Sequence, residues 1–323
     1  MKFTWKSWLQ KNKKIIALSP MDGWTDSGFR QMIKKISPLT LVFTEFVSVD
    51  GLTHKECSQR LLQKAIYHDK KEKPLIVQLF GNNPEKFALA ASFLEKQGIG
   101  AIDLNFGCPA RKVIHSNHGA ALLKNEKLAL EIVKAVKKAT KLNVSVKTRL
   151  GFFDKNQILN LAEKLFQEKV DALIVHGRTA KEKFSRHSDL KNIFELKKRF
   201  PQNIIMANGD IKDPLKAVEI LEKTDGVMIG RQAMQNPWIF AEIFSALKKE
   251  QFPFVTWKQK IELILFHAQK KQEIKGKRGI IEMRKFLVNF CKEFKNARYY
   301  RQKLIQTETL QEIKEIFRKL NFN

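Results

Sequence analysis

The feature that most constrains the fold is a repeated alternation between short apolar segments and segments with helical spacing. Eight apolar segments rich in β-branched residues recur along the first 231 residues. They are IIALSPM (15–21), LVFTEFV (41–47), PLIVQLFG (74–81), AIDLNFGC (101–108), VSVKTRLG (144–151), ALIVHGRT (172–179), IIMANGD (204–210) and GVMIGR (226–231). Short segments that are apolar at most positions are typical of strands buried on both faces, as in parallel sheets.

The segments between these strands predict helices. Residues 84–98 and 125–140 place apolar side chains at helical spacing, and NPEK and KNEK supply helix-start signals. Eight strand-then-helix units predict an α/β fold of the (β/α)₈ TIM-barrel class. A doubly wound open sheet is the alternative, and the lack of a GxGxxG motif after the first strand disfavours its dinucleotide-binding form.

The strand pattern stops near residue 243, and helical patterns then cover 257–274, 279–304 and 309–320. We therefore predict a barrel domain of residues 1–243 followed by an all-helical domain of residues 244–323. In the helix expected over 279–304, one side is apolar and the other is almost entirely cationic. Arg284 and Lys285 lie on the cationic side with Lys292, Lys295 and Arg298, a pattern that suits contact with a phosphate backbone.

The net charge indicates the class of partner. The chain has 60 Lys and Arg against 33 Asp and Glu, a formal charge of +27. Residues 244–323 hold 19 Lys and Arg against 8 Asp and Glu, so the charge is densest in the helical domain. A field of this sign attracts polyanions, and we expect a nucleic acid partner, with an anionic membrane surface as the competing interpretation.

Other sequence features point to a cytoplasmic protein. No segment approaches the ~18 consecutive apolar residues of a membrane span, and the N-terminus lacks the apolar run of a secretory signal. Cys57, Cys108 and Cys291 are too few and too scattered for a disulfide framework, which agrees with a reducing compartment. His54 and Cys57 lack two further ligands at metal spacing, so we expect no metal site.

Polar residues gather at the C-terminal ends of the predicted strands, where barrel enzymes assemble their active sites. These residues are Pro20, Met21, Asp22, Gln78, Asn105, Cys108, Lys147, Arg149, His176, Arg178, Asn208, Gly209, Asp210, Gly230 and Arg231. Any one of them is compatible with an ordinary turn, but the whole set predicts a single site.

The types of residue in this set favour a phosphate-bearing cofactor. Loops after the last two strands of barrels often bind phosphate, Gly209 and Gly230 allow close backbone approach, and Arg231 adds a fixed cation. Lys147 lies within a strand, where a buried ammonium group needs an anion. A reduced flavin would supply that anion, with Gln78 and the backbone of 20–22 bonding the ring edge.

Cys108 follows its strand between Gly107 and Pro109, which places a thiol at the predicted barrel mouth. A barrel cysteine is more often small core filler, but this one lies beyond the apolar run. The loop continues with Arg111 and Lys112, two cations suited to a polyanion.

These motifs resemble those of the tRNA-dihydrouridine synthase family over nearly the whole chain, and most of all its bacterial branch usually lettered B. The matching stretches are SPMDGWTDSGFR (19–30), VQLFGNNPE (77–85), DLNFGCPARKV (103–113), GAALL (119–123), SVKTRLG (145–151), HGRT (176–179), ANGDI (207–211), GVMIGRQAMQNPW (226–238) and MRKF (283–286). The Asn-x-Gly-Cys-Pro stretch is the most specific. Asp22 and Trp24 depart from the smaller apolar residues of many members.

The resemblance implies a TIM barrel that reduces the C5–C6 double bond of tRNA uridines with FMN and NADPH (or NADH). It implies Cys108 as the proton donor. It also implies FMN binding by Pro20, Met21, Asp22, Gln78, Lys147, His176, Asn208, Gly209, Asp210, Gly230 and Arg231. Together with the cations noted above, the predicted substrate contacts are Asn105, Arg111, Lys112, Arg149, Arg178, Arg284 and Lys285.

This chemistry gives the thiol a role. Hydride transfer to C6 of uracil leaves negative charge toward C5, which an acid on the opposite face must protonate. A thiol with a pKa near ~8.5 is mostly protonated at neutral pH, and the uridine must be flipped out of the folded RNA to reach it.

Two alternatives stay open at this point. A flavin barrel oxidoreductase acting on a free pyrimidine, similar to dihydroorotate dehydrogenase, explains Lys147 but not the charge. A non-catalytic RNA-binding barrel explains the charge but gives Cys108 no role. The sequence leaves the modified uridine, the use of ribosomal RNA and the preferred reductant undetermined, and we expect a monomer.

Overall fold

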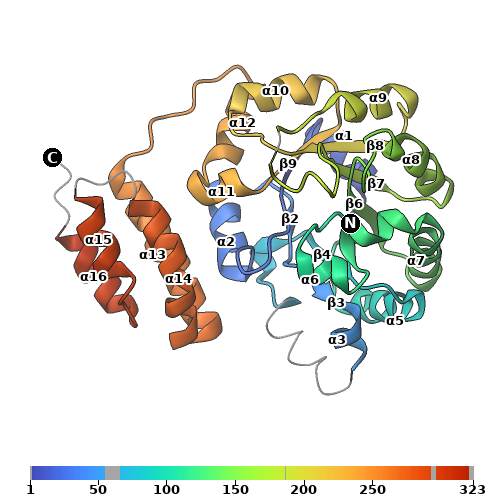
Figure 1. The fold of residues 1–323 in the computed structure, drawn as a ribbon. Coiled ribbons are helices and arrows are strands. Elements are labelled where there is room, and N and C mark those ends of the chain that lie inside the picture. Colours follow the sequence, from blue (N-terminus) through green and yellow to red (C-terminus); the bar gives the residue numbers. More distant parts are fainter. Residues whose placement is uncertain (1, 55–65, 186, 292–295, 320–323) are drawn as a thin grey trace.

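The fold is a closed parallel barrel with a helical region attached to one side (Figure 1). The computed structural model describes residues 2–54, 66–185, 187–291 and 296–319. In these ranges the strands are β1 (Ile15–Leu18), β2 (Val42–Phe43), β3 (Val47–Ser48), β4 (Leu75–Phe80), β5 (Ala101–Phe106), β6 (Asn143–Arg149), β7 (Ala172–His176), β8 (Ile204–Asn208) and β9 (Gly226–Ile229).

The strand order closes the sheet on itself. All paired strands are parallel, in the order β1-β9-β8-β7-β6-β5-β4-β2. The N–H of Leu41 donates to the carbonyl of Ile16 (2.9 Å) and the N–H of Leu18 to that of Leu41 (2.8 Å), which joins the two ends. This closure confirms the predicted TIM barrel and removes the open-sheet alternative.

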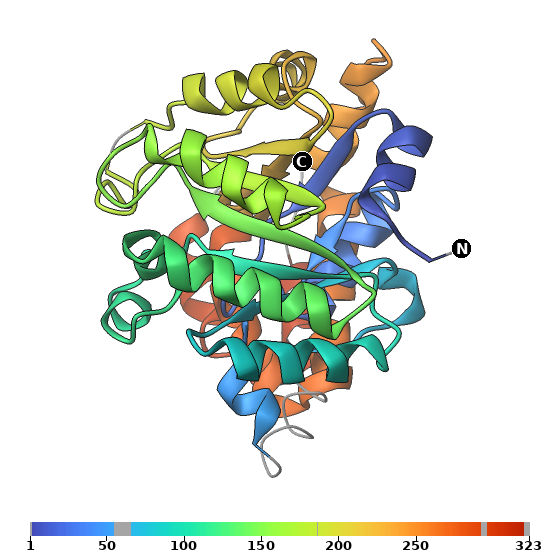
Figure 2. The same cartoon turned by 90° about the vertical axis from the view of Figure 1, so that its right-hand side faces the viewer.

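Helices surround the barrel. They are α1 (Trp5–Asn12), α2 (Ser27–Ile36), α3 (Val49–Thr53), α5 (Pro84–Glu95), α6 (Arg111–His115), α7 (Glu126–Ala139), α8 (Gln157–Gln167), α9 (Lys191–Arg199), α10 (Pro214–Glu222), α11 (Arg231–Gln235) and α12 (Ile239–Leu247), with short 3₁₀ turns at Lys70–Glu72 and Gly119–Lys124. The helices predicted over 84–98 and 125–140 are confirmed as α5 and α7. Figure 2 shows helices lying across the outside of the strands. In the described ranges, no helix is long and apolar enough to cross a bilayer.

The single strand predicted over 41–47 is wrong, because the structure has β2 and β3 there. Both pair with β4: Phe43 lies opposite Ile76 and Val47 opposite Leu79. The four residue steps from Phe43 to Val47 therefore lie opposite only three steps, from Ile76 to Leu79, as in a β-bulge. The inserted residue interrupts the strand and turns Phe46 toward the barrel mouth, where it lines a cavity.

The barrel interior changes from apolar to polar along its axis. Inward positions near the strand starts are filled by buried apolar side chains, among them Ile15, Phe43, Ile76, Ile174 and Met206. Trp5 of α1 is fully buried against this cluster and closes the N-terminal end. The same alternation then brings polar side chains inward at the strand ends, so the site lies at the opposite end from this core.

The helical region follows α12. The predicted boundary after residue 243 lies within α12, which packs on α10 of the barrel, and residues 248–256 contain no helix or strand. The helices that follow are α13 (Trp257–Lys275), α14 (Lys277–Phe290), α15 (Ala297–Leu304) and α16 (Leu310–Arg318). Helix α13 packs on α2 of the barrel.

The continuous helix predicted over 279–304 is wrong. Helix α14 ends at Phe290, and Asn296 has a left-handed φ of 61° at the start of α15, which breaks the helical path. Met283 and Leu287 are buried, as their apolar side predicts. Cys57, Lys292 and Lys295 lie outside the described residues.

Candidate active site at the barrel mouth

A cavity of about 260 Å³ opens at the C-terminal ends of the strands. It brings together most of the residues singled out from the sequence: Pro20, Met21, Asp22, Gln78, Asn105, Cys108, Lys147, Arg149, His176, Asn208, Gly209, Asp210, Gly230 and Arg231. A second cavity of about 510 Å³, lined by Arg178 and Lys212, shares the Asn208–Asp210 segment with the first. The two adjoin, so the site is long enough for a ring and an extended tail.

Cys108 is held at this mouth by backbone hydrogen bonds. The side-chain oxygen Oδ1 of Asn105 accepts from the N–H groups of Gly107 (3.2 Å) and Cys108 (2.9 Å). The Cys108 carbonyl accepts from the N–H of Ala120 (3.1 Å). The main chain and Asn105 therefore hold the loop, and the N–H of Ala110 also donates to the Cys108 sulfur.

The Cys108 thiol stays protonated. Burial raises its pKa above the ordinary 9.0, although the Ala110 N–H, Lys147 and Arg149 oppose this. A protonated thiol beside two cations can release its proton as an acid, because the cations then stabilise the thiolate.

A buried polar network supports Asn105 from below. Asn105 Nδ2 donates to Gln78 Oε1 (2.9 Å), and Gln78 Nε2 donates to Asp103 Oδ2 (2.7 Å). Asp103 also accepts from Ser145 Oγ (2.6 Å). Burial raises the pKa of Asp103 to about 7. The sequence interpretation assigned Asp103 no role, although an acid at an inward position of an apolar strand is a signal that points to one.

Lys147 projects into the cavity from β6. Its Nζ donates to Asn208 Oδ1 (3.0 Å), and Asn208 Nδ2 donates to the Met228 carbonyl (2.7 Å). Burial, together with the charge of Arg149, lowers the pKa of Lys147 to about 8. Its positive charge is therefore costly without an anion in the cavity, as expected for a cofactor contact.

His176 is neutral and keeps one unused donor. Burial, and then the charges of Arg149, Lys147 and Arg178, hold its pKa far below the ordinary 6.5. Arg178 Nη1 lies 3.4 Å from His176 Nε2. A guanidinium only donates, so Nε2 accepts and Nδ1 carries the hydrogen. That buried Nδ1 has no partner among the described residues, so an acceptor on a ligand would satisfy it.

Asp210 joins two arginines at the second cavity. It accepts hydrogen bonds from Arg178, from Arg231 (3.0 Å) and from the N–H of Ser188 (3.0 Å). Arg231 remains 54% exposed, so its guanidinium is accessible to an anion. Gly209 has a φ of +122°, and a Cβ there would lie 2.3 Å from Ser188 Oγ, so only glycine fits this turn.

The donor set fits a flat anionic ligand with a phosphate tail. Lys147, Arg149 and Arg231 line the first cavity, and Lys212 lines the second. The unpartnered His176 Nδ1 supplies a further donor at the same mouth. These groups are the types that bind a flavin ring edge and a phosphate.

Two aromatic residues at the mouth were missed from the sequence. Phe46 is turned inward by the bulge, for which the sequence carries no signal. Phe184 is 53% exposed, and the guanidinium carbons of Arg149 and Arg231 lie 5.3 and 4.9 Å from its ring centre. Its position depends on the loop after β7, so periodicity does not reveal it.

The predicted RNA contacts fall into two groups. Arg111 and Lys112 are exposed on α6 at the rim. The guanidinium of Arg149 donates instead to carbonyls of the protein, including that of Gly107 (2.8 Å). Arg284 donates to the Thr307 carbonyl (3.0 Å), and Lys285 donates to the Gly23 carbonyl.

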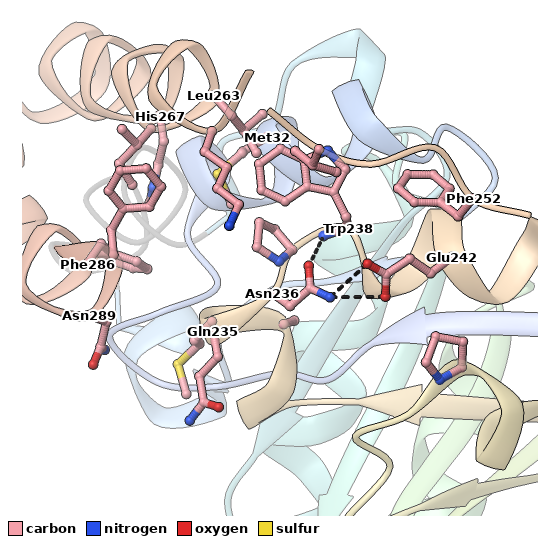
Figure 3. Close-up of a pocket in the computed structure, with 18 of the residues that line it drawn as sticks. Met32, Gln235, Asn236, Trp238, Glu242, Phe252, Leu263, His267, Phe286 and Asn289 are labelled. Atoms are coloured by element: carbon pink, nitrogen blue, oxygen red, sulfur yellow. Dashed lines mark hydrogen bonds between the residues drawn. The ribbon is translucent and has the colours of Figure 1, made fainter. Parts of the chain in front are cut away.

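A larger cavity of about 710 Å³ lies elsewhere, between the barrel and the helical region (Figure 3). Its lining includes Trp238, His267 and Phe286, and none of the site residues predicted from the sequence. Asn236 Nδ2 donates to both carboxylate oxygens of Glu242 (2.9 and 3.0 Å) at its edge. Size therefore does not identify the site, and the convergence of titratable groups at the mouth is the better guide. In the part of the chain that the structure describes, no group of three His, Cys, Asp or Glu side chains is placed to hold a metal.

Comparisons with known proteins show the family to which the chain belongs. A family described as dihydrouridine synthase (Dus) matches residues 16–322. A probable tRNA-dihydrouridine synthase 1 from Synechocystis sp. is 34% identical over 304 residues, covering 92% of this chain and 84% of the relative. A probable tRNA-dihydrouridine synthase from Rickettsia bellii is 36% identical, covering 79% of this chain and 78% of the relative. Among solved structures, a 2-naphthoyl-CoA reductase shares the fold with a TM-score of 0.56 at 10% identity, over 74% of this chain and 52% of that one.

Proposed function

Because the chain belongs to the dihydrouridine synthase family, we propose that it reduces uridine in tRNA with FMN at the barrel mouth and Cys108 as the acid. The enzyme is a tRNA-dihydrouridine synthase that saturates the C5–C6 bond of the uracil ring. The observation that carries the proposal is a protonated thiol at the same cavity as a buried lysine, Lys147.

The FMN site is built from residues that already converge. Lys147 and Gln78 would face the ring, together with the main chain of 20–22, and Arg231 and Gly209 would hold the phosphate. When bound and reduced, FMN supplies the hydride that adds to C6 of uracil. His176 Nδ1–H, which has no acceptor among the described residues, would donate to the cofactor or the base.

Cys108 would complete the reduction by donating its proton to C5 of uracil. The S–H bond breaks, a C–H bond forms at C5, and the thiolate that remains lies beside Lys147 and Arg149. Asn105 orients this step, because its Oδ1 holds the Cys108 N–H (2.9 Å). A proton from solvent then restores the thiol.

The charge of the chain brings the RNA to the site. At +27 the protein attracts tRNA over distances of about a Debye length, and Arg111 and Lys112 on the rim would contact its phosphates. The predicted pair Arg284 and Lys285 add to this field. The helical region would therefore support tRNA binding next to a barrel that carries the chemistry.

We propose NADPH as the reductant, with NADH as the alternative. The ratio of kcat/KM for the two reductants decides the preference. The protein would act on tRNA rather than on a free pyrimidine, since a small substrate needs no such charge.

The test uses the purified protein with unmodified tRNA, FMN and NADPH, and measures dihydrouridine by mass spectrometry of the digested RNA. We expect product in tRNA and none from free uridine or orotate. Turnover of a free pyrimidine with no RNA product would support the small-molecule oxidoreductase. A protein with no affinity for FMN would support the non-catalytic RNA-binding alternative.

A further inference from the structure

The loop between β1 and α2 has two faces, and one of them belongs to the proposed cofactor site. Pro20, Met21 and Asp22 line the cavity at the barrel mouth. The loop then turns back, since the N–H groups of Trp24 and Thr25 both donate to the Met21 carbonyl at 3.0 Å. A displacement of Gly23 or Trp24 would therefore move Met21 in the cavity.

The other face of this loop rests on α14 of the helical region. Lys285 Nζ donates to the Gly23 carbonyl and lies 4.4 Å from the centre of the Trp24 ring. The ring of Phe286 packs edge-to-face on Trp24, with 4.7 Å between ring centres. A lysine ammonium over an indole face is attracted by the negative face of the ring, so this contact stabilises the loop against α14.

The base of the loop is also tied to the helical region. Asp26 accepts from the N–H of Phe29 at the start of α2 (3.2 Å) and from the ammonium groups of Lys271 (2.7 Å) and Lys275 (2.9 Å). Asp26 and Lys271 are both buried. These ion pairs join α13 to the base of the loop, and losing a close partner of a buried charge is costly.

Gly23 leaves room for this arrangement. Its φ is +72°, and a Cβ would lie 3.2 Å from Lys285 Nζ. The turn therefore needs a residue without a side chain, and the space beside it is filled by the lysine.

We propose that Lys285 is a positioning residue for the FMN site: it holds the Met21–Thr25 loop in the conformation that lines the cavity. The inference rests on the proposed function for the identity of the cofactor. It gives Lys285 a different role from the phosphate contact predicted by the sequence, because its ammonium is already bound to a carbonyl and an aromatic ring. The helical region is then part of the cofactor site as well as a surface for tRNA.

Arg284 provides a matched control. It is the neighbouring cation of the same motif, but its guanidinium donates to the carbonyls of Thr307 (3.0 Å) and Gln306 (3.4 Å) inside the helical region. Neutralising either residue removes one positive charge. Only the change at Lys285 removes a contact with the loop.

The experiment measures the Kd of FMN for the full-length apoprotein by flavin fluorescence, without RNA, in Lys285→Met, Lys285→Arg and Arg284→Met. We expect Lys285→Met to weaken FMN binding by about 2- to 30-fold, the range that the lost cation–π contact predicts. Lys285→Arg should restore affinity and the visible circular dichroism of bound FMN, since arginine also donates and stacks. Arg284→Met should bind FMN like the wild type.

Wild-type FMN affinity in Lys285→Met, with weakened tRNA binding, would overturn the inference in favour of a phosphate contact. If Lys285→Met does not fold, Trp24→Leu tests the same contact from the loop side, and unchanged FMN affinity there would also overturn it. A wild-type apoprotein that does not bind FMN would instead refute the proposed function.

Discussion

Replacing Cys108 by alanine should abolish RNA reduction while leaving the cofactor site intact. The main-chain bonds that fix the loop remain, because they run from the N–H of Cys108 to Asn105 and from the N–H of Ala120 to the Cys108 carbonyl. The substitution therefore removes only the sulfur. We expect FMN affinity and NADPH oxidation within about twofold of wild type, because these two main-chain bonds remain when the Ala110 N–H loses its contact with the sulfur.

The size of the effect follows from the role of the thiol. A positioned general acid contributes about 10²–10⁴-fold to a rate, which corresponds to roughly 3–5 kcal/mol of transition-state stabilisation. Because burial raises the pKa of Cys108 above 9.0, at least about nine-tenths of the thiol is protonated at pH 8. The wild-type rate should stay nearly level to about pH 8 and fall at higher pH, with a midpoint above pH 9, as the acid is lost.

The assay is a single turnover with pre-reduced FMN and unmodified tRNA, with dihydrouridine quantified over time. Cys291→Ala is the matched control, because Cys291 is buried at the end of α14, away from the barrel mouth. A Cys108→Ala variant that forms product at the wild-type rate would refute the role of the thiol. A wild-type rate that falls with a midpoint near pH 7 would refute the prediction that the Cys108 thiol is protonated at pH 8.

Three further substitutions test the supporting structure. Asp26→Ala should cost roughly 3 kcal/mol in urea unfolding at pH 7, because the buried Lys271 loses its nearer carboxylate and keeps only Glu282 at 3.6 Å. Burial raises the pKa of Asp26, but the charges of Lys271 and Lys275 outweigh burial and hold this pKa below 3.8. The stability difference between wild type and Asp26→Ala should therefore shrink as the pH falls below 3.8. Gly209→Ala should lose flavin on purification, because its Cβ would lie 2.3 Å from a side-chain oxygen and its φ is +122°. Burial raises the pKa of Asp103 from 3.8 to about 7, so the wild-type apoprotein should lose folding stability as the pH rises through that interval. Asp103→Asn does not titrate, and its stability relative to wild type should therefore increase from pH 5 to pH 8.

Local patterns located the strands well because a strand buried on both faces has to be apolar almost throughout. They also placed Gln78 and Lys147 within strands and Asn208 at a strand end, and parallel strands of a barrel end at one mouth. The pattern failed at 41–47, where the extra residue shows only in the register of Phe43 and Val47 against β4. It also failed after Phe290, where a left-handed residue starts a new helix.

The partners of each charged group were less accessible to sequence reasoning. Arg284 and Lys285 are cations of the type that contacts phosphate, but in the fold both donate to backbone carbonyls of the chain. Asp103 looked like part of an apolar strand, yet it anchors the network below Asn105 through Gln78. These bonds join residues far apart in the chain, so no local period encodes them.

The sequence alone determined the alternation of strands and helices, the family, the positive charge and the set of residues that end the strands, because each depends on residue type and local spacing. Only the tertiary structure decided which of these residues touch. Closure of the barrel brought Lys147 to Asn208 and the thiol to the mouth, and the packing of α14 brought Lys285 to the Met21–Thr25 loop. The reason is physical: burial and hydrogen-bond partners depend on strand register and helix docking, which are properties of the whole fold.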